Sequence, residues 1–203
     1  MQAQVEQEVD RMTDMVRKNI EDSFEALLSS DIGKSEEIDD REEYIDYLNV
    51  EISRYIVHVM SSETGSQDLV NISGYYTVVS NLERIGDHAM NIAGYAANLK
   101  KWKQTFSEEA LGEIGRMRDM CLKTIDDIRD FTQGRKDKIL EKTAKNEQKI
   151  DDMRDDYREK QVARMQKGTC QADTGIIYSE ILTDFERIGD HALNIAQKYN
   201  EIA

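Results

Sequence analysis

Two copies of one short stretch contain the residues best suited to chemistry. Residues 83–93 and residues 186–196 are identical at ten of eleven positions, and the eleventh exchanges Met90 for Leu193. Each copy contains a glutamate and an aspartate four residues apart, Glu83 with Asp87 and Glu186 with Asp190. This spacing puts both carboxylates on one face of a helix. Because like charges repel at that distance, we expect a compensating charge, and a bound cation is the leading candidate.

A second pair of carboxylates lies upstream of each copy. Glu42 and Asp46 precede the first copy, and Glu147 and Asp151 precede the second. If each upstream helix forms an antiparallel hairpin with the next helix, equal rise on both sides places the two pairs at one level. The expected quartets are Glu42, Asp46, Glu83 and Asp87 (the first quartet) and Glu147, Asp151, Glu186 and Asp190 (the second quartet).

Four carboxylates at one level need a counter-charge to remain ionised. All-oxygen clusters suit hard cations such as Mg²⁺, Ca²⁺, Mn²⁺ or oxidised iron. Oxygen-activating centres in helical bundles add a Glu-x-x-His motif, which is missing here, so a redox enzyme is disfavoured. We expect His88 and His191, next to the aspartates, to be hydrogen-bonded packing residues. Alternatively, Arg84 and Arg187 neutralise the carboxylates and form a structural salt-bridge network.

The hydrophobic periodicity predicts an all-α fold of six long helices. The chain has no proline, and residues 116–127 repeat elements of residues 11–22. The aspartates of this repeat, Asp14, Asp22, Asp119 and Asp127, are expected on solvated faces. This duplication predicts two tandem three-helix bundles, residues 1–104 and 105–203. Gly33 is expected to end the first helix, and the inward stripe of the third includes Tyr76. The helices are expected at about 1–30, 36–62, 67–103, from Ser107 to Gly134, 136–166, and from beyond Gly168 to the C-terminus.

Composition excludes several classes of function. The formal charge of −14 argues against nucleic-acid binding. No apolar run is long enough to span a membrane, and the N-terminal residues do not read as a signal peptide. Cys121 and Cys170 occupy non-equivalent places in the two halves and are expected to be reduced. We therefore expect a cytoplasmic location.

The doubled motif, with an upstream Glu-x-x-x-Asp in each half, resembles the PhoU family of phosphate-uptake regulators over essentially the whole chain. The resemblance implies two pseudo-symmetric three-helix bundles and metal clusters, with iron or zinc the favoured ions. The ligands carried over are the eight residues of the two quartets. The family is regulatory and is not known for catalysis.

Residues 164–170, 175–178 and 184–188 resemble the cytoplasmic tail of bacterial sodium-dependent phosphate cotransporters. This resemblance implies a regulatory domain that contacts the transporter's membrane domain on the cytosolic side of the inner membrane. The first alternative is a stand-alone regulator of a phosphate ABC transporter and its sensor kinase. Alternatives of other classes are a carboxylate-bridged metal enzyme and a structural helical adaptor. Self-association is left open.

Overall fold

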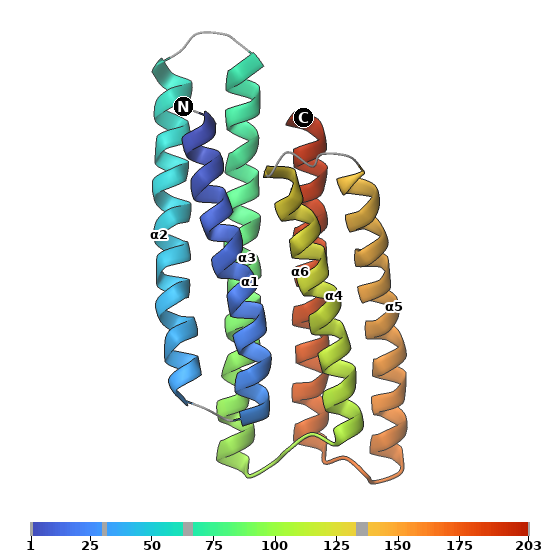
Figure 1. Cartoon of the computed structure of the whole chain (residues 1–203). Coiled ribbons are helices and arrows are strands. Elements are labelled where there is room, and N and C mark those ends of the chain that lie inside the picture. The colour runs from blue at the N-terminus through green and yellow to red at the C-terminus, as the bar shows by residue number, and fades with distance from the viewer. Residues whose placement is uncertain (1, 30–31, 63–66, 133–137, 203) are drawn as a thin grey trace.

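The computed structural model describes residues 2–29, 32–62, 67–132 and 138–202, and these form helices and short connections without a strand (Figure 1). The predicted all-α fold is confirmed. The six helices are α1 (Gln2–Ser29), α2 (Ile32–Ser62), α3 (Gln67–Trp102), α4 (Glu108–Thr132), α5 (Ile139–Gln166) and α6 (Ala172–Ile202).

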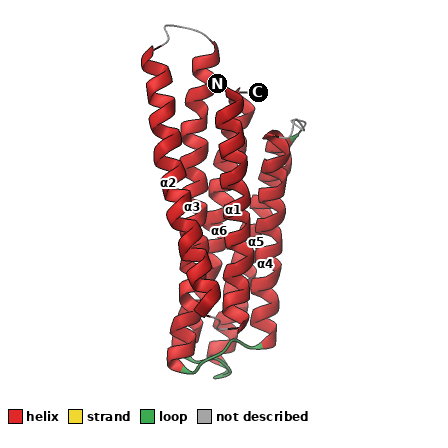
Figure 2. Cartoon of the chain, turned by 60° about the vertical axis from the view of Figure 1, so that its left-hand side comes forward, coloured by secondary structure: helices red, strands yellow, loops and turns green. Residues whose placement is uncertain are grey.

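The helices form two three-helix bundles that lie side by side with their axes nearly aligned (Figures 1 and 2). Helices α1–α3 make the first bundle and α4–α6 the second, and α3 packs against α6 where the two meet. Helix α1 also contacts α4. This arrangement agrees with the predicted tandem repeat. The expected boundary between residues 104 and 105 lies in the connection from α3 to α4 and stays a prediction.

Two of the expected helix ends have the geometry that their residues predict. The hydroxyl of Ser107 accepts a hydrogen bond of 3.2 Å from the backbone N–H of Ala110, as an N-cap of α4 should. Gly168 has a positive φ of 70°, and the backbone N–H groups of Gly168 and Thr169 donate back to Met165 and Arg164. This Schellman motif ends α5, and glycine accommodates its left-handed conformation without strain.

Other expected boundaries differ or lie outside the described residues. The prediction that Gly33 separates the first two helices is wrong, because α2 begins at Ile32 and includes Gly33 in its first turn. Helix α5 begins at Ile139 after Lys138, which adopts a left-handed conformation. A turn is expected at residues 61–66, but Ser61 and Ser62 still belong to α2. The rest of that turn and the stop at Gly134 fall outside the described residues.

The core runs along the facing sides of all six helices and corrects two expectations about single residues. Tyr76, expected to point inward, is half exposed, whereas its neighbour Tyr75 is buried against Tyr199. The rings of Tyr75 and Tyr199 meet edge to face, with centroids 6.2 Å apart. Asp22, expected on a solvated face, is buried and paired with Lys18 and Arg41.

The cysteines and the hydropathy agree with the predictions. Cys121 is buried and Cys170 half-buried, and both thiols are free, as expected for reduced residues. Within the described ranges, no helix contains an apolar stretch long enough to cross a bilayer.

Candidate metal centre

The first quartet lies between α2 and α3, as the hairpin argument predicts. Glu42 and Asp46 come from α2, and Glu83 and Asp87 come from α3. The carboxylate of Glu42 lies against Gly86, which stands on α3 between Glu83 and Asp87. Each of the other three carboxylates repels Glu42 electrostatically. The four acidic side chains therefore share one region of the first bundle.

Glu42 is the deepest of these groups. Its side chain is buried, with 4% of its surface exposed, while Glu83 is half-buried and Asp46 and Asp87 are exposed. Burial, followed by the charges of Asp87, Asp46 and Glu83, raises the pKa of Glu42 to about 8. Burial and neighbouring carboxylates also raise the pKa values of Glu83 and Asp87. The ionised forms of these carboxylates are therefore disfavoured unless a positive charge lies beside them.

Glu42 also has an oxygen atom without a partner. Asn19 donates a hydrogen bond of 3.3 Å to Oε2, but Oε1 is buried and has no hydrogen-bond partner among the residues that the structure describes. A methyl group added to Gly86 would collide with this carboxylate, so the glycine is what makes room for it. A buried, unsatisfied carboxylate oxygen beside three further carboxylates fits a hard cation. Within the described ranges, no three acidic, histidine or cysteine side chains are already gathered closely enough to hold a metal ion.

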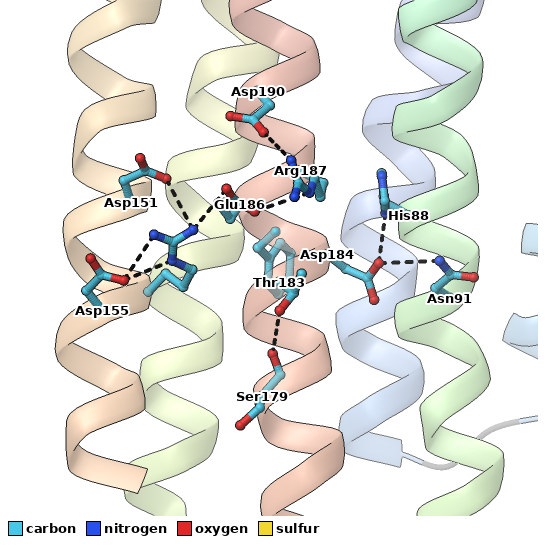
Figure 3. Close-up of polar contacts among 12 residues, drawn as sticks. His88, Asn91, Asp151, Asp155, Ser179, Thr183, Asp184, Glu186, Arg187 and Asp190 are labelled. Carbon is cyan, nitrogen blue, oxygen red and sulfur yellow. Dashed lines mark hydrogen bonds and ion pairs between the residues drawn. The ribbon is translucent and has the colours of Figure 1, made fainter. Parts of the chain in front are cut away.

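The second quartet, between α5 and α6, has a different environment. Arg154 of α5 contacts Glu186 at 2.9 Å and lies 3.9 Å from Asp151. Arg187 of α6 pairs with Asp190 at 3.0 Å and lies 3.6 Å from Glu186 (Figure 3). Burial and the acidic neighbours raise the pKa values of Glu147 and Glu186, although both arginines oppose the change at Glu186. The second quartet is thus partly neutralised by the protein itself.

The salt-bridge alternative therefore describes one half of the chain. Arg187 pairs with its carboxylates as that alternative expects, but Arg84, its counterpart, forms no ion pair with Glu83 or Asp87. None of the four first-quartet carboxylates forms an ion pair with another residue in the described part of the chain.

The histidines and asparagines of the repeated motif join the two bundles. His88 and Asn91 of α3 donate to Asp184 of α6 at 2.8 and 3.3 Å (Figure 3). The symmetry-related residues His191 and Asn194 of α6 donate to Asn81 of α3 at 3.0 and 3.3 Å. We call these six residues the inter-repeat clasp.

The clasp explains why the motif contains more than its two carboxylates. The rings of His88 and His191 stack with centroids 5.6 Å apart. Burial, together with the charges of His88 and Arg84, lowers the pKa of His191 to about 4, so this ring is neutral near pH 7. The expectation that both histidines are hydrogen-bonded packing residues is confirmed.

Sequence reasoning did not find Arg154 or the clasp partners Asn81 and Asp184. Arg154 is followed by two aspartates, so its pairing with Glu186 on another helix was not readable from the chain. Asn81 and Asp184 stand two residues before the repeated Glu-Arg in both halves. Their equivalent positions in the two repeats and their similar side-chain shapes could have indicated that they share a role.

Comparisons with known proteins relate the whole chain to one family. The family model described as the PhoU domain matches residues 9–96 and 114–199. A "phosphate-specific transport system accessory protein PhoU homolog 1" of Thermotoga maritima is 28% identical over 193 residues, which cover 94% of this chain and 82% of the relative. A similarly named homologue of Clostridium acetobutylicum is 26% identical, covering 92% of this chain and 85% of the relative.

Solved structures show the same fold. The crystal structure of PhoU from Pseudomonas aeruginosa has a TM-score of 0.89 at 23% identity, covering 98% of this chain and 95% of that one. The phosphate transport system regulatory protein PhoU from Streptococcus pneumoniae has a TM-score of 0.82 at 21% identity, with coverages of 98% and 93%.

Proposed function

The chain belongs to the PhoU family, and on that premise we propose that it is a non-catalytic accessory regulator of phosphate uptake. The observation that carries the proposal is the match of the family model to both helical repeats, residues 9–96 and 114–199. The regulator would act at the cytosolic face of the membrane, on a phosphate transporter or its signalling protein.

The relatives favour one of the two regulatory readings over the other. The Thermotoga and Clostridium proteins are named as accessory proteins of phosphate-specific transport systems, and the match covers 82% and 85% of their lengths. This supports the accessory-regulator alternative better than the transporter-tail reading taken from residues 164–188. The motif resemblance remains as the basis of that second reading.

We also propose that the regulator binds a hard cation in its carboxylate clusters. Support comes from the buried, unbonded Oε1 of Glu42 and from the mutual repulsion of the four carboxylates of the first quartet. A bound cation would supply the positive charge that this region lacks. The exposed carboxylates of Asp46 and Asp87 would move inward to complete the ligand set, because the repulsion between them would then be relieved.

The role of a carboxylate-bridged metal enzyme has weaker support. Both motif histidines use Nδ1 in the clasp between α3 and α6, so they serve the inter-repeat contact. A redox centre of the helical-bundle type uses histidines that face the carboxylates.

Deletion of the gene in its own host tests the regulatory function. We expect phosphate uptake in the deletion strain to lose its dependence on external phosphate, and the wild-type gene to restore that dependence. A deletion strain whose uptake responds to external phosphate as the parent's does would contradict the proposal. Complementation with the double variant Glu83→Gln/Asp87→Asn asks whether regulation needs the first quartet.

A further inference from the structure

The two quartets differ at one equivalent position on α2 and α5. Glu42 and Asp46 correspond to Glu147 and Asp151, and three residues after each aspartate stand Asn49 and Arg154. The first half therefore has a neutral amide at the position where the second half has a guanidinium. Because the two hairpins are repeats of one another, Asn49 and Arg154 occupy equivalent positions beside otherwise similar carboxylates.

Arg154 places its charge among the carboxylates of the second quartet. Its Nη1 lies 2.9 Å from Oε1 of Glu186 and 3.9 Å from Oδ1 of Asp151. Glu186 is buried, with 8% of its surface exposed, so solvent screens this pair weakly. Arg187 adds a second positive charge at Asp190. A cation entering here would meet two guanidinium groups that already pair with its ligands.

Asn49 offers an oxygen where Arg154 offers a charge. Its Oδ1 is buried and has no hydrogen-bond partner in the described part of the chain. The Oε1 atom of Glu42 has the same two properties. Amide and carboxylate oxygens are the ligands that hard cations take in proteins. Oδ1 of Asp151 in the second quartet also makes no hydrogen bond, but it lies 3.9 Å from the guanidinium of Arg154, whereas Glu42 has no ion pair among the described residues. Two unsatisfied buried oxygens in one hairpin are costly unless something binds them.

We infer that the two halves use different counter-charges: a hard cation held by the first quartet together with Asn49, and the guanidinium groups of Arg154 and Arg187 in the second quartet. This inference rests on the proposed metal binding and specifies where in the chain that binding occurs. The chain is thus a duplicated metal protein in which one copy of the site is closed by its own side chains.

Mn²⁺ titration of chelator-treated protein tests the inference. We expect Glu83→Gln/Asp87→Asn to remove nearly all bound Mn²⁺, measured by elemental analysis after dialysis and by calorimetry. We expect the matched variant Glu186→Gln/Asp190→Asn to retain it. Equal losses in the two variants, with intact Mn²⁺ binding in the wild type, would overturn the asymmetry and leave the metal-binding proposal standing. A wild-type protein that binds no Mn²⁺ would overturn both.

Exchanging the residue types at positions 49 and 154 tests the inference in both directions. Arg154→Asn should open the second quartet and add Mn²⁺ binding that survives Glu83→Gln/Asp87→Asn. Asn49→Arg should weaken binding at the first quartet by tenfold or more. Arg158→Asn removes the same charge one helical turn further along α5, where Arg158 bonds Thr183, and should change nothing.

Thermal melting of each variant verifies folding, and Arg154→Gln serves as a second opening variant where Arg154→Asn unfolds. If a folded Arg154 variant binds no additional Mn²⁺, the arginine does not substitute for an ion, and the inference is wrong.

Discussion

Glu42 is the most buried of the eight quartet carboxylates, and the described residues around it provide one amide donor, Asn19, and no ion pair. The spacing of the chain predicted which carboxylates would meet in this hairpin. It did not predict that Glu42 would be buried while Asp46, one turn away, stays exposed. Glu42 lies against Gly86 of α3, so its burial depends on how the two helices pack.

Replacing Glu42 with glutamine tests the cost of its buried charge. Glu42→Gln keeps the shape and removes the repulsion, so we expect the metal-free protein at pH 7.5 to gain about 1–2 kcal/mol in free energy of unfolding. Urea denaturation with a chelator present measures this. Glu43→Gln, at the exposed neighbouring position, is the control and should change stability by less than about 0.5 kcal/mol. Equal stabilities of the two variants would show that the Glu42 charge carries no cost.

The pKa of Asp22 is shifted in the opposite direction to that of Glu42, so the charge of Asp22 is expected to stabilise the fold. Burial would raise its pKa, but the hydrogen bonds from Lys18 and Arg41 and their charges outweigh burial and lower it. A lowered pKa in the folded state gives stability that is present above the unfolded pKa of about 3.9 and is lost as the pH falls through the folded value. We therefore expect Asp22→Asn to cost about 2–3 kcal/mol at pH 7 and progressively less below pH 4.

Urea denaturation of Asp22→Asn at pH 7, 5 and 3.5 measures that dependence, with the exposed Asp39→Asn as the matched control. A cost that stays constant over this range would show that the ion pair with Arg41 does not stabilise the fold through the charge of Asp22.

At the scale of elements, the helices and their pairing followed from periodicity, the absence of proline and the repeat. What the chain could not specify is the rotation of each helix about its axis. Tyr75 and Tyr76 are adjacent, and the contacts of Tyr75 with Tyr199 of α6 and with Glu6 of α1 accompany the burial of Tyr75 alone. Arg154 is a similar case, because local acidic residues compete in the sequence with Glu186 across the bundle.

Three helical glycines differ in how closely a neighbouring helix approaches them. A methyl group at Gly86 meets the Glu42 carboxylate, one at Gly189 meets Cδ1 of Ile150 at 3.1 Å, and one at Gly94 meets nothing within 4 Å. We expect Gly86→Ala to weaken Mn²⁺ binding at least tenfold by displacing Glu42. Gly94→Ala should leave binding unchanged and add about 0.5–1 kcal/mol of stability through helix propensity. Calorimetry and urea denaturation report the two effects, and unchanged binding in Gly86→Ala would remove Glu42 from the ligand set.

The inter-repeat clasp gives a prediction about the contact between α3 and α6. Asn81 accepts from His191 and Asn194 with an amide oxygen, while Asp184 accepts from His88 and Asn91 with a carboxylate. Because an amide already serves in one half, we expect Asp184→Asn to cost under about 1 kcal/mol and Asp184→Ala about 2–3 kcal/mol. Urea denaturation measures both, and equal costs would mean that the clasp hydrogen bonds do not stabilise the interface.

At the scale of the whole molecule, the duplicated hairpins lie on either side of the α3–α6 contact (Figure 1). Helices α3 and α6 therefore each contribute to the clasp and to one quartet, which is completed by α2 in the first bundle and by α5 in the second. The repeated motif serves two purposes at once. Its histidine and asparagine join the bundles, and its glutamate and aspartate face the neighbouring helix of their own bundle. This division explains why the motif is so similar in both halves while the surrounding residues differ.

A crystal structure of the protein grown with Mn²⁺ tests metal binding by the first quartet, because anomalous scattering locates the ion without reference to any assay. We expect an anomalous peak between α2 and α3, within bonding distance of oxygens from Glu42, Glu83 and Asp87. A map without a peak there, in which those carboxylates point separately into solvent at saturating Mn²⁺, would contradict this expectation.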